Sequence, residues 1–374
     1  MSRVAREPLP AEVSLFLDIS RGVAALLVLL HHVFHPPFFD RTVYFPGRDA
    51  VVLFFVLSGF LIAHASQGLQ DWRLYAVARL SRVVSVALPA LLLTGMLYLL
   101  AGALGTRSMD YDHPALRLLI SALFLNQSWN LTVAALSNGP YWSLCFEVFY
   151  YAMFGAALFA RGPWRWGLLV LLALAAGPRI LLLMPIWLIG VAAYHLSRRA
   201  WQVAPRPWHA PLAWALFALL LLNLGRWDPL AGASAAIEAG LHEGYWRVGG
   251  VSIYIGGDHR FLSDWWLALQ FAALILLSRS LGLSALLGTP LEKPWRVLAA
   301  YSFSLYLFHA PLLIFLHPLL APWLAPQQMP WLMIPLLLLL VRVLGSWTED
   351  KRETYARWFR HLLMPSSTPS AATP

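Results

Sequence analysis

Ten apolar runs, most of them long enough to cross a lipid bilayer, dominate this sequence and restrict how it can fold. They cover about residues 14–34, 49–66, 82–104, 141–160, 165–177, 179–196, 210–225, 263–281, 297–317 and 329–348. A spanning helix needs roughly 20 apolar residues, and its backbone groups must pair internally because the bilayer core holds no water. The pattern predicts an all-α integral membrane protein, a bundle of about ten transmembrane helices. The fifth to seventh runs are short, so some of these helices are expected to be tilted, broken or merged.

The charges support this prediction and give it an orientation. Only 12% of the residues are charged, whereas soluble domains carry about 25%. The net charge of +9 would suit a nucleic-acid partner, but the basic residues lie in short loops between apolar runs, which is typical of membrane proteins. With the N-terminus in the cytoplasm, 17 of the 27 Lys and Arg residues fall on the cytoplasmic side and eight on the outer side. This excess predicts that both termini are cytoplasmic and that nucleic acid is not a partner.

We expect a single transmembrane domain over residues 1–360 and a low-complexity, disordered tail at 361–374. The first run lacks a small-residue cleavage site, so it is expected to be a retained span rather than a signal peptide. The segment 114–127 is too short to span and is expected to be re-entrant or interfacial. The longest polar connection, 226–262, is expected to face outward, and loops of this length are often functional. It contains Glu238, His242, Glu243, Asp258 and His259.

Several ionisable residues interrupt the apolar runs, where they are costly and usually face a bundle interior or a wet cavity. They are Asp18, Arg21, His31, His32, Glu147, His309 and Arg342, with His64 near the end of a run. Arg21 and His32 are eleven positions apart, so they share one helix face about 16 Å apart along the axis. His31 projects well away from that face and is the weaker candidate. No group has the spacing of a metal site, and the single cysteine, Cys145, excludes an internal disulfide.

The predicted depth of these residues separates them into two groups. Arg21, Arg342, Arg79 and Arg82 lie toward the cytoplasm, whereas His32, Glu147 and His309 lie in the outer half. Arginine favours phosphate through bidentate hydrogen bonds, and His and Glu are the usual proton-transfer groups. The gradient suits a phosphate-rich donor entering from the cytoplasm and a proton-losing acceptor arriving from outside.

Each of these residues also has a structural interpretation. Asp18 can pair with Arg21 three positions away, and Arg342 can reach lipid headgroups. Arg79 and Arg82 can act only as topology charges, Glu147 can be a structural hydrogen-bond acceptor, and His309 can bond a backbone carbonyl freed by Pro311. A structural role is hardest to argue for His32.

Five sequence motifs resemble those of one known family. They read FLDISRGVAALLVLLHHVF, GRDAVVLFFVLSGFLIA, ARLSRVVSVALPAL, YWSLCFEVFYY and AAYSFSLYLFHAPLL, and they span about residues 19–313 in the family's order. The chain resembles the membrane-bound acyltransferase-3 family, whose bacterial members O-acylate cell-surface and secreted carbohydrates. The resemblance implies a ten-span fold in the bacterial cytoplasmic (inner) membrane. It also implies acyl-CoA, by default acetyl-CoA, as donor and a carbohydrate or glycolipid as acceptor.

By this resemblance His32 is the catalytic histidine, Arg21, Arg79 and Arg82 are functionally important, and Glu147 is the motif acid. In our hypothesis the three arginines bind the phosphates of the donor. The chain departs from the family at Val148, where a second Glu often follows the first. No hydrolase-like outer domain is apparent, so the transfer is expected to finish within the bundle or on a separate protein.

We therefore predict an O-acyltransferase in which His32 acts as general base or transient acyl carrier. Glu147 would orient the imidazole, as the third member of a triad does. Asp18, His309 and Arg342 are further candidates. One alternative is a transporter or flippase for an anionic or glycolipid substrate, for which paired broken spans in two halves would be expected. The other alternative is a membrane receptor or scaffold that catalyses no reaction. The acceptor is left open, with the loop 226–262 as its natural specificity element.

Overall fold

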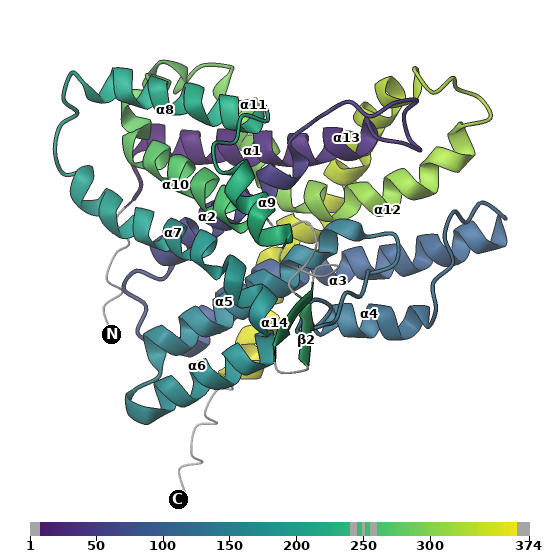
Figure 1. Cartoon of the computed structure of the whole chain (residues 1–374), viewed down its shortest axis with the longest axis horizontal. Helices are drawn as coiled ribbons and strands as arrows, with labels where there is room; N and C mark the ends of the chain where they lie inside the picture. Colours follow the sequence, from purple (N-terminus) through teal and green to yellow (C-terminus); the bar gives the residue numbers. More distant parts are fainter. Residues whose placement is uncertain (1–7, 240–244, 249–250, 255–259, 365–374) are drawn as a thin grey trace, which may run out of the picture.

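The computed structural model describes residues 8–239, 245–248, 251–254 and 260–364. The longer helices are α1 (Ala11–Val33), α2 (Gly47–Ala65), α3 (Trp72–Ala103), α5 (Trp142–Phe159), α6 (Gly162–Ala176), α7 (Pro178–Ala200), α8 (His209–Leu224), α10 (Phe261–Leu277), α12 (Ser302–Leu320), α13 (Met329–Thr348) and α14 (Arg352–Leu363). Shorter ones are α4 (Pro114–Ala122), α9 (Ala231–Ala239) and α11 (Glu292–Ala300), with single 3₁₀ turns η1 (Gly139–Tyr141), η2 (Ser278–Ser280), η3 (Leu283–Leu286) and η4 (Glu349–Lys351). Figure 1 shows the helices, many of them lying roughly parallel.

The helical prediction is confirmed for the described residues apart from one hairpin. Strands β1 (Tyr245–Val248) and β2 (Val251–Tyr254) pair antiparallel within the connection that was predicted to be a loop. Among the described residues, eight helices are long and apolar enough to cross a membrane. The fifth and seventh predicted runs form α6 and α8, which are shorter apolar helices. His242, Glu243, Asp258 and His259 of the connection lie outside the described residues.

Two predicted boundaries need correction. The third span was expected to begin at residue 82, but α3 begins at Trp72 and has 32 residues, which corresponds to a length of about 48 Å. The hydrocarbon core is only about 30 Å thick, so α3 can carry Arg79 and Arg82 on a part that extends beyond that core. An apolarity criterion starts the span at the last charged residue and therefore misses the helix before it.

The ninth predicted run is divided into two helices. The polar α11 ends at Ala300, and α12 begins at Ser302. Near the C-terminus, α14 ends at Leu363, three residues into the segment that was expected to be a disordered tail. Residues 365–374 are outside the described part of the chain.

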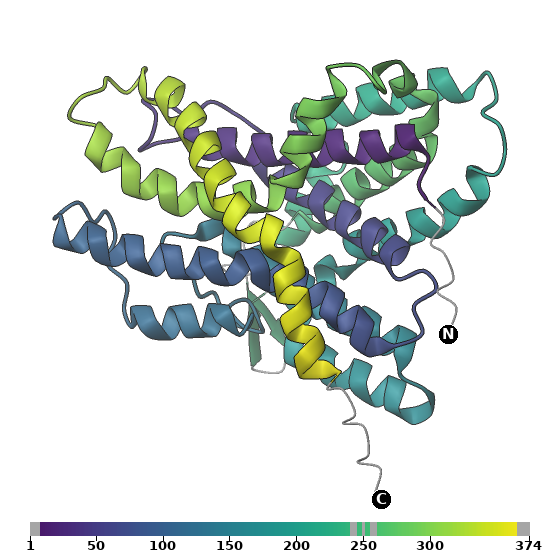
Figure 2. The ribbon, with the colours of Figure 1, turned by 180° about the vertical axis from the view of Figure 1, so that it is seen from behind.

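Helix α2 lies at the centre of the bundle, where it packs against α1, α7 and α10 (Figures 1 and 2). Its crossing with α7 depends on two glycines. A Cβ on Gly59 would collide with the backbone carbonyl of Trp187, and one on Gly190 with that of Val56. Small residues at such positions let helix backbones approach closely, which is a main source of packing energy between helices in lipid. The Ser-Gly-Phe run of α2 is therefore a packing element.

The proline inside α12 is compensated by a distant side chain. Pro311 has no N–H, so the carbonyl of Leu307, four residues earlier, loses its helical partner. Asn138 donates its side-chain amide to that carbonyl at 2.9 Å. A freed backbone carbonyl at this depth needs such a partner because lipid supplies none. The contact fixes the loop before α5 against the middle of α12.

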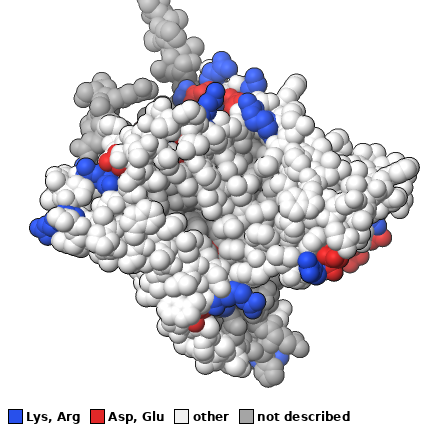
Figure 3. Space-filling model, turned by 90° about the horizontal axis from the view of Figure 1, so that it is seen from above, with Lys and Arg blue, Asp and Glu red and all other residues white. Residues whose placement is uncertain are grey.

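The charged side chains are distributed as a bilayer requires. On the face shown in Figure 3, Lys, Arg, Asp and Glu lie mainly toward the margins, and a broad area between them carries none. Large apolar side chains are exposed on the long helices, among them Leu92 and Leu99 of α3. This surface suits contact with lipid.

Candidate active site

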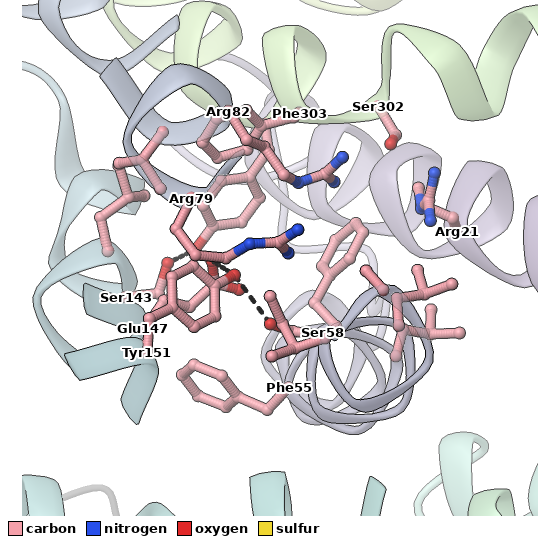
Figure 4. A pocket seen from close by; sticks show the side chains of 18 of the residues that line it. Arg21, Phe55, Ser58, Arg79, Arg82, Ser143, Glu147, Tyr151, Ser302 and Phe303 are labelled. Atoms are coloured by element: carbon pink, nitrogen blue, oxygen red, sulfur yellow. Dashed lines mark hydrogen bonds between the residues drawn. The ribbon is translucent and has the colours of Figure 1, made fainter. Parts of the chain in front are cut away.

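One cavity collects the arginines that were predicted to bind the donor. It has a volume of about 310 Å³ and is lined by residues from α1, α2, α3, α5, α12 and α14. Arg21 comes from α1, and Arg79 and Arg82 come from the first turns of α3. Figure 4 shows Arg79 and Arg82 extending from α3 and Arg21 beside them on α1. We call this the inner cavity, because its residues lie toward the end of the bundle that is predicted to be cytoplasmic.

The inner cavity has a large excess of positive charge. Its lining includes a fourth arginine, Arg352 of α14, which was not among the predicted site residues. Glu147 is the one carboxylate of the lining. The Nε of Arg79 is buried and has no hydrogen-bond partner, and the carboxylate paired with Arg21, that of Asp18, is 4.0 Å away. Several guanidinium groups gathered around a single lining carboxylate favour an anionic ligand with several oxygens.

Glu147 takes part in a hydrogen-bonded chain on the wall of this cavity. Tyr151 donates its hydroxyl to Glu147 Oε2 at 2.7 Å, and the same hydroxyl lies 2.9 Å from Ser58 Oγ. Trp187 donates its indole N–H to Ser58 at 3.2 Å. The expected contact from Glu147 to the His32 imidazole is not formed, so that part of the prediction is wrong. Tyr151 lies one helical turn after Glu147, and its hydroxyl satisfies the carboxylate locally.

The neighbour of His32 is His309 of α12. His309 is buried, with 1% of its surface exposed, and its Nε2 lies 3.3 Å from His32 Nδ1. The two rings meet edge to face with their centroids 4.9 Å apart. His309 therefore occupies the position that the sequence analysis gave to Glu147.

Backbone carbonyls determine which nitrogen of each ring carries the proton. His32 Nδ1 is 2.8 Å from the carbonyl of Val28, and His309 Nδ1 is 2.8 Å from the carbonyl of Leu305. A carbonyl oxygen only accepts, so both Nδ1 atoms are N–H donors in the neutral rings. His32 shares its Nδ1–H between Val28 and the lone pair on His309 Nε2. This assignment leaves the lone pair of His32 on Nε2, available to accept a proton or an acyl group.

The structural interpretation of His309 is partly right. Its ring does bond a backbone carbonyl, but that carbonyl belongs to Leu305, while the one freed by Pro311 is bound by Asn138. Asp18 lies 2.6 Å from Arg296 of α11, so its main partner is that residue and Arg21 is a weaker one. The Arg342 guanidinium is exposed and stacks on the Tyr301 ring at 4.4 Å, and the inner-cavity lining does not include Arg342.

A second cavity lies at the opposite end of the bundle, and we call it the outer cavity. It has a volume of about 500 Å³, and its lining includes His31. Val51 and Phe55 line both cavities and form the wall between them. His32 lines neither cavity. Its sequence neighbour His31 lines the outer cavity. Tyr306, whose ring contacts that of His309, lines the inner cavity. The histidine pair thus lies between a cationic cavity and an outer one.

Some of these residues carried a signal that the sequence analysis did not use. Tyr151 follows Glu147 by one helical turn, which is the spacing of a side-chain pair on one helix face. Arg352 follows shortly after the last apolar run, but nothing local indicates that α14 packs against α3. Among the described residues, no group of three or more His, Cys, Asp or Glu side chains is arranged to hold a metal ion.

Comparison with known proteins now adds to this geometry. A family model described as an acyltransferase domain matches residues 14–348. The chain belongs to the acyltransferase-3 family. The family supports an acyl-transfer activity, and with the apolar helices above it indicates a multi-pass membrane protein.

Two curated relatives match part of the chain. Protein 2 in the picA locus of Rhizobium radiobacter is 32% identical over 175 residues, which cover 42% of this chain and 84% of the relative. The O-acetyl transferase of Shigella phage Sf6 is 28% identical over 151 residues, which cover 38% of this chain and 45% of the relative. The chain therefore matches less than half of the phage protein's length. No solved structure matches the chain significantly.

Proposed function

We propose that the protein is an O-acyltransferase that moves an acyl group, by default acetyl, from cytoplasmic acyl-CoA to a hydroxyl of a cell-surface or secreted carbohydrate. It would lie in the bacterial inner membrane with ten spans, including α6 and α8, and with both termini in the cytoplasm. The observation that carries this proposal is the gathering of four arginines from α1, α3 and α14 around one carboxylate in the inner cavity. The family and the name of the phage relative support the reaction class.

The inner cavity would hold the phosphates of CoA. A phosphate offers oxygens to several guanidinium groups at once, and each charge-assisted hydrogen bond contributes about 1.5–3 kcal/mol. Burial of Arg79 Nε without a partner has a cost that such a ligand would remove. The pantetheine arm would then extend from Arg21 toward His32, a distance of about 16 Å along α1.

The chemistry would take place at His32 Nε2. With His32 as general base, this nitrogen takes the proton of the acceptor hydroxyl while the hydroxyl oxygen attacks the thioester carbonyl. The C–S bond then breaks, and the CoA thiolate leaves and is protonated. With His32 as acyl carrier, Nε2 attacks the thioester carbonyl first, the C–S bond breaks and the CoA thiolate leaves. The acceptor hydroxyl oxygen then attacks the acyl carbonyl, the bond to Nε2 breaks, and the hydroxyl proton passes to the thiolate. His309 acts in both cases as a positioning residue, because its Nε2 accepts part of the Nδ1–H that Val28 also binds and so helps to hold the ring with Nε2 unprotonated.

The donor site can be tested with purified protein in lipid and labelled acetyl-CoA, by measuring CoA release that depends on carbohydrate. Arg82→Gln should raise the KM for acetyl-CoA by about tenfold or more, because it removes a charge-assisted contact of about 1.5–3 kcal/mol. Arg342→Gln is the matched control, since this arginine stacks on Tyr301 outside the cavity, and its KM should stay unchanged. Equal effects of the two variants would contradict the proposed donor site.

The reaction class has its own test. His32→Ala should lower the rate of acyl transfer by about 10²–10⁴-fold, which is the contribution of a well-placed general base. A transporter would instead move its substrate across vesicles without releasing CoA. Transfer at a near-normal rate by His32→Ala, or transport without CoA release by the unaltered protein, would overturn the proposal.

A further inference from the structure

The outer cavity is built by parts of the chain that are far apart in sequence. His31 lies in the last turn of α1, and the first turns of α2, α7 and α10 contribute Arg48, Arg179 and Asp264. The segment before α5 closes one side with residues from Gln127 to Trp142. These helix ends all meet at the same end of the bundle, away from the first turns of α3 that line the inner cavity. The volume of about 500 Å³ lies within the usual range of small-molecule sites, about 300–1,000 Å³.

The charged groups in the lining of this cavity pair mainly with other groups of the same lining. Arg48 donates two hydrogen bonds to the Asp264 carboxylate, both at 3.1 Å. Arg179 donates to the side-chain amide oxygen of Gln127. The positive excess is thus one charge here, against three in the inner cavity. A ligand with several phosphates suits the inner cavity, whereas the outer one suits a ligand rich in neutral hydroxyl groups.

The remaining groups of the lining have the properties that a sugar ring requires. The Arg48–Asp264 pair and the Gln127 amide keep unused donors and acceptors, and each sugar hydroxyl can both donate and accept. Trp142 is half-buried and, with Phe55, gives the cavity an aromatic side against which the apolar C–H face of a sugar can pack. His31 donates its Nδ1–H to the carbonyl of Phe45 at 3.0 Å, so its Nε2 is an acceptor in the neutral ring.

We propose that the outer cavity is the acceptor subsite and binds the sugar ring that receives the acyl group. Arg48, Asp264, Gln127 and His31 hydrogen-bond its hydroxyls, and Trp142 contacts its ring. Because Val51 and Phe55 form the wall toward the inner cavity, the sugar and the CoA phosphates bind on opposite sides of it. This inference rests on the proposed function, since it names the place of that reaction's acceptor.

The subsite differs from the specificity element expected from the sequence. The described residues of the connection 226–262 are absent from the lining. Its hairpin instead contacts the segment before α5, where Asn130 donates to the backbone carbonyl of Ser252 at 3.0 Å. Among the described residues, the recognition groups therefore come from helix ends and from residues 127–142.

Cysteine labelling tests the cavity independently of catalysis. The single cysteine is buried, so Thr132→Cys in a Cys145→Ala background places one reactive thiol at the exposed rim of the cavity. We expect a membrane-impermeant maleimide added to intact cells to label this position. Methyl glycosides of glucose, galactose, mannose and rhamnose are the protecting probes, and at least one should slow labelling at least threefold, whereas CoA should not. Absence of labelling from outside, no protection by any glycoside, or protection by CoA would each overturn the inference.

Kinetics provide a second arm with a matched control. Gln127→Met should raise the KM for the carbohydrate acceptor at least tenfold and leave the KM for acetyl-CoA unchanged. Gln328→Met is the control, because Gln328 lies exposed in the turn before α13 and outside both linings. Acyl transfer with an unaltered acceptor KM in Gln127→Met would overturn the acceptor subsite alone. Absence of acyl transfer in the unaltered protein would instead count against the proposed function, while the labelling result would still judge the cavity.

Discussion

Replacing His309 by alanine tests whether this residue acts through His32. In the structure the His32 Nδ1–H is shared between Val28 O at 2.8 Å and His309 Nε2 at 3.3 Å. The variant removes only the longer of these contacts. A neutral hydrogen bond contributes about 0.5–1.5 kcal/mol, which corresponds to a rate change of about 2–12-fold. We therefore expect kcat to fall by about that factor, far less than the 10²–10⁴-fold loss for His32→Ala.

The assay is carbohydrate-dependent CoA release by purified protein in lipid, with kcat and the KM for acetyl-CoA determined separately. The His309 variant should leave this KM unchanged, because His309 does not line the inner cavity. Glu147→Gln is the comparison, since Glu147 lies among the arginines and should alter the KM for acetyl-CoA more than kcat.

The double variant decides whether the two histidines form one unit. Residues that act together in catalysis lose activity non-additively, so His32→Ala with His309→Ala should be no slower than His32→Ala alone. A further loss by the full factor of the single His309 variant would refute the reasoning. A loss of 10³-fold or more in His309→Ala would also refute it, because the contact to Val28 should preserve the tautomer.

Three other predictions concern stability and follow from particular contacts. Gly190→Ala should destabilise the protein by about 1–3 kcal/mol through overpacking of the α2–α7 crossing. Gly167→Ala is the control and should have no such effect, because a Cβ there meets open space. Equal thermal midpoints of the two variants would contradict this prediction. Asn138→Leu should lower the free energy of unfolding by about 1–3 kcal/mol, because the buried carbonyl of Leu307 is then unpaired. Adding Pro311→Ala should reduce that loss, because residue 311 then has its own N–H to donate. A loss that stays the same would count against the proposed compensation. In the loop before α2, burial raises the pKa of Tyr44 to about 12, above the value of about 10 expected for the unfolded chain. The protonated hydroxyl therefore stabilises the fold below pH 10, and this contribution should be lost between about pH 10 and 12 in denaturation curves but not in Tyr44→Phe.

The residues of α1 show how much of the site the sequence could predict. Arg21 and His32 belong to one helix, and their common face follows from a rotation of about 100° per residue. The prediction that Arg21, Arg79 and Arg82 share the donor side required only the alternation of spans and the distribution of charge. Both arguments use local periodicity and the cost of burying polar groups in lipid, and the structure places these three arginines in one cavity.

Glu147 shows where such reasoning stops. Its depth in the membrane was predicted, but the direction in which α5 presents it was not. That direction places the carboxylate beside Tyr151 and the arginines. Arg352 is a similar case, because it reaches the inner cavity only through the packing of α14 against α3.

The sequence by itself determined that the chain is a helical membrane protein, which segments are apolar, and which residues share a face within one helix. The tertiary structure alone decided which helices lie next to each other, and so made His309 the neighbour of His32 across 277 positions. It also decided that helix ends from α1, α2, α7 and α10 enclose the outer cavity. The physical reason is that helical periodicity is a local property, whereas helix pairing depends on close packing between surfaces, as at Gly59 and Gly190.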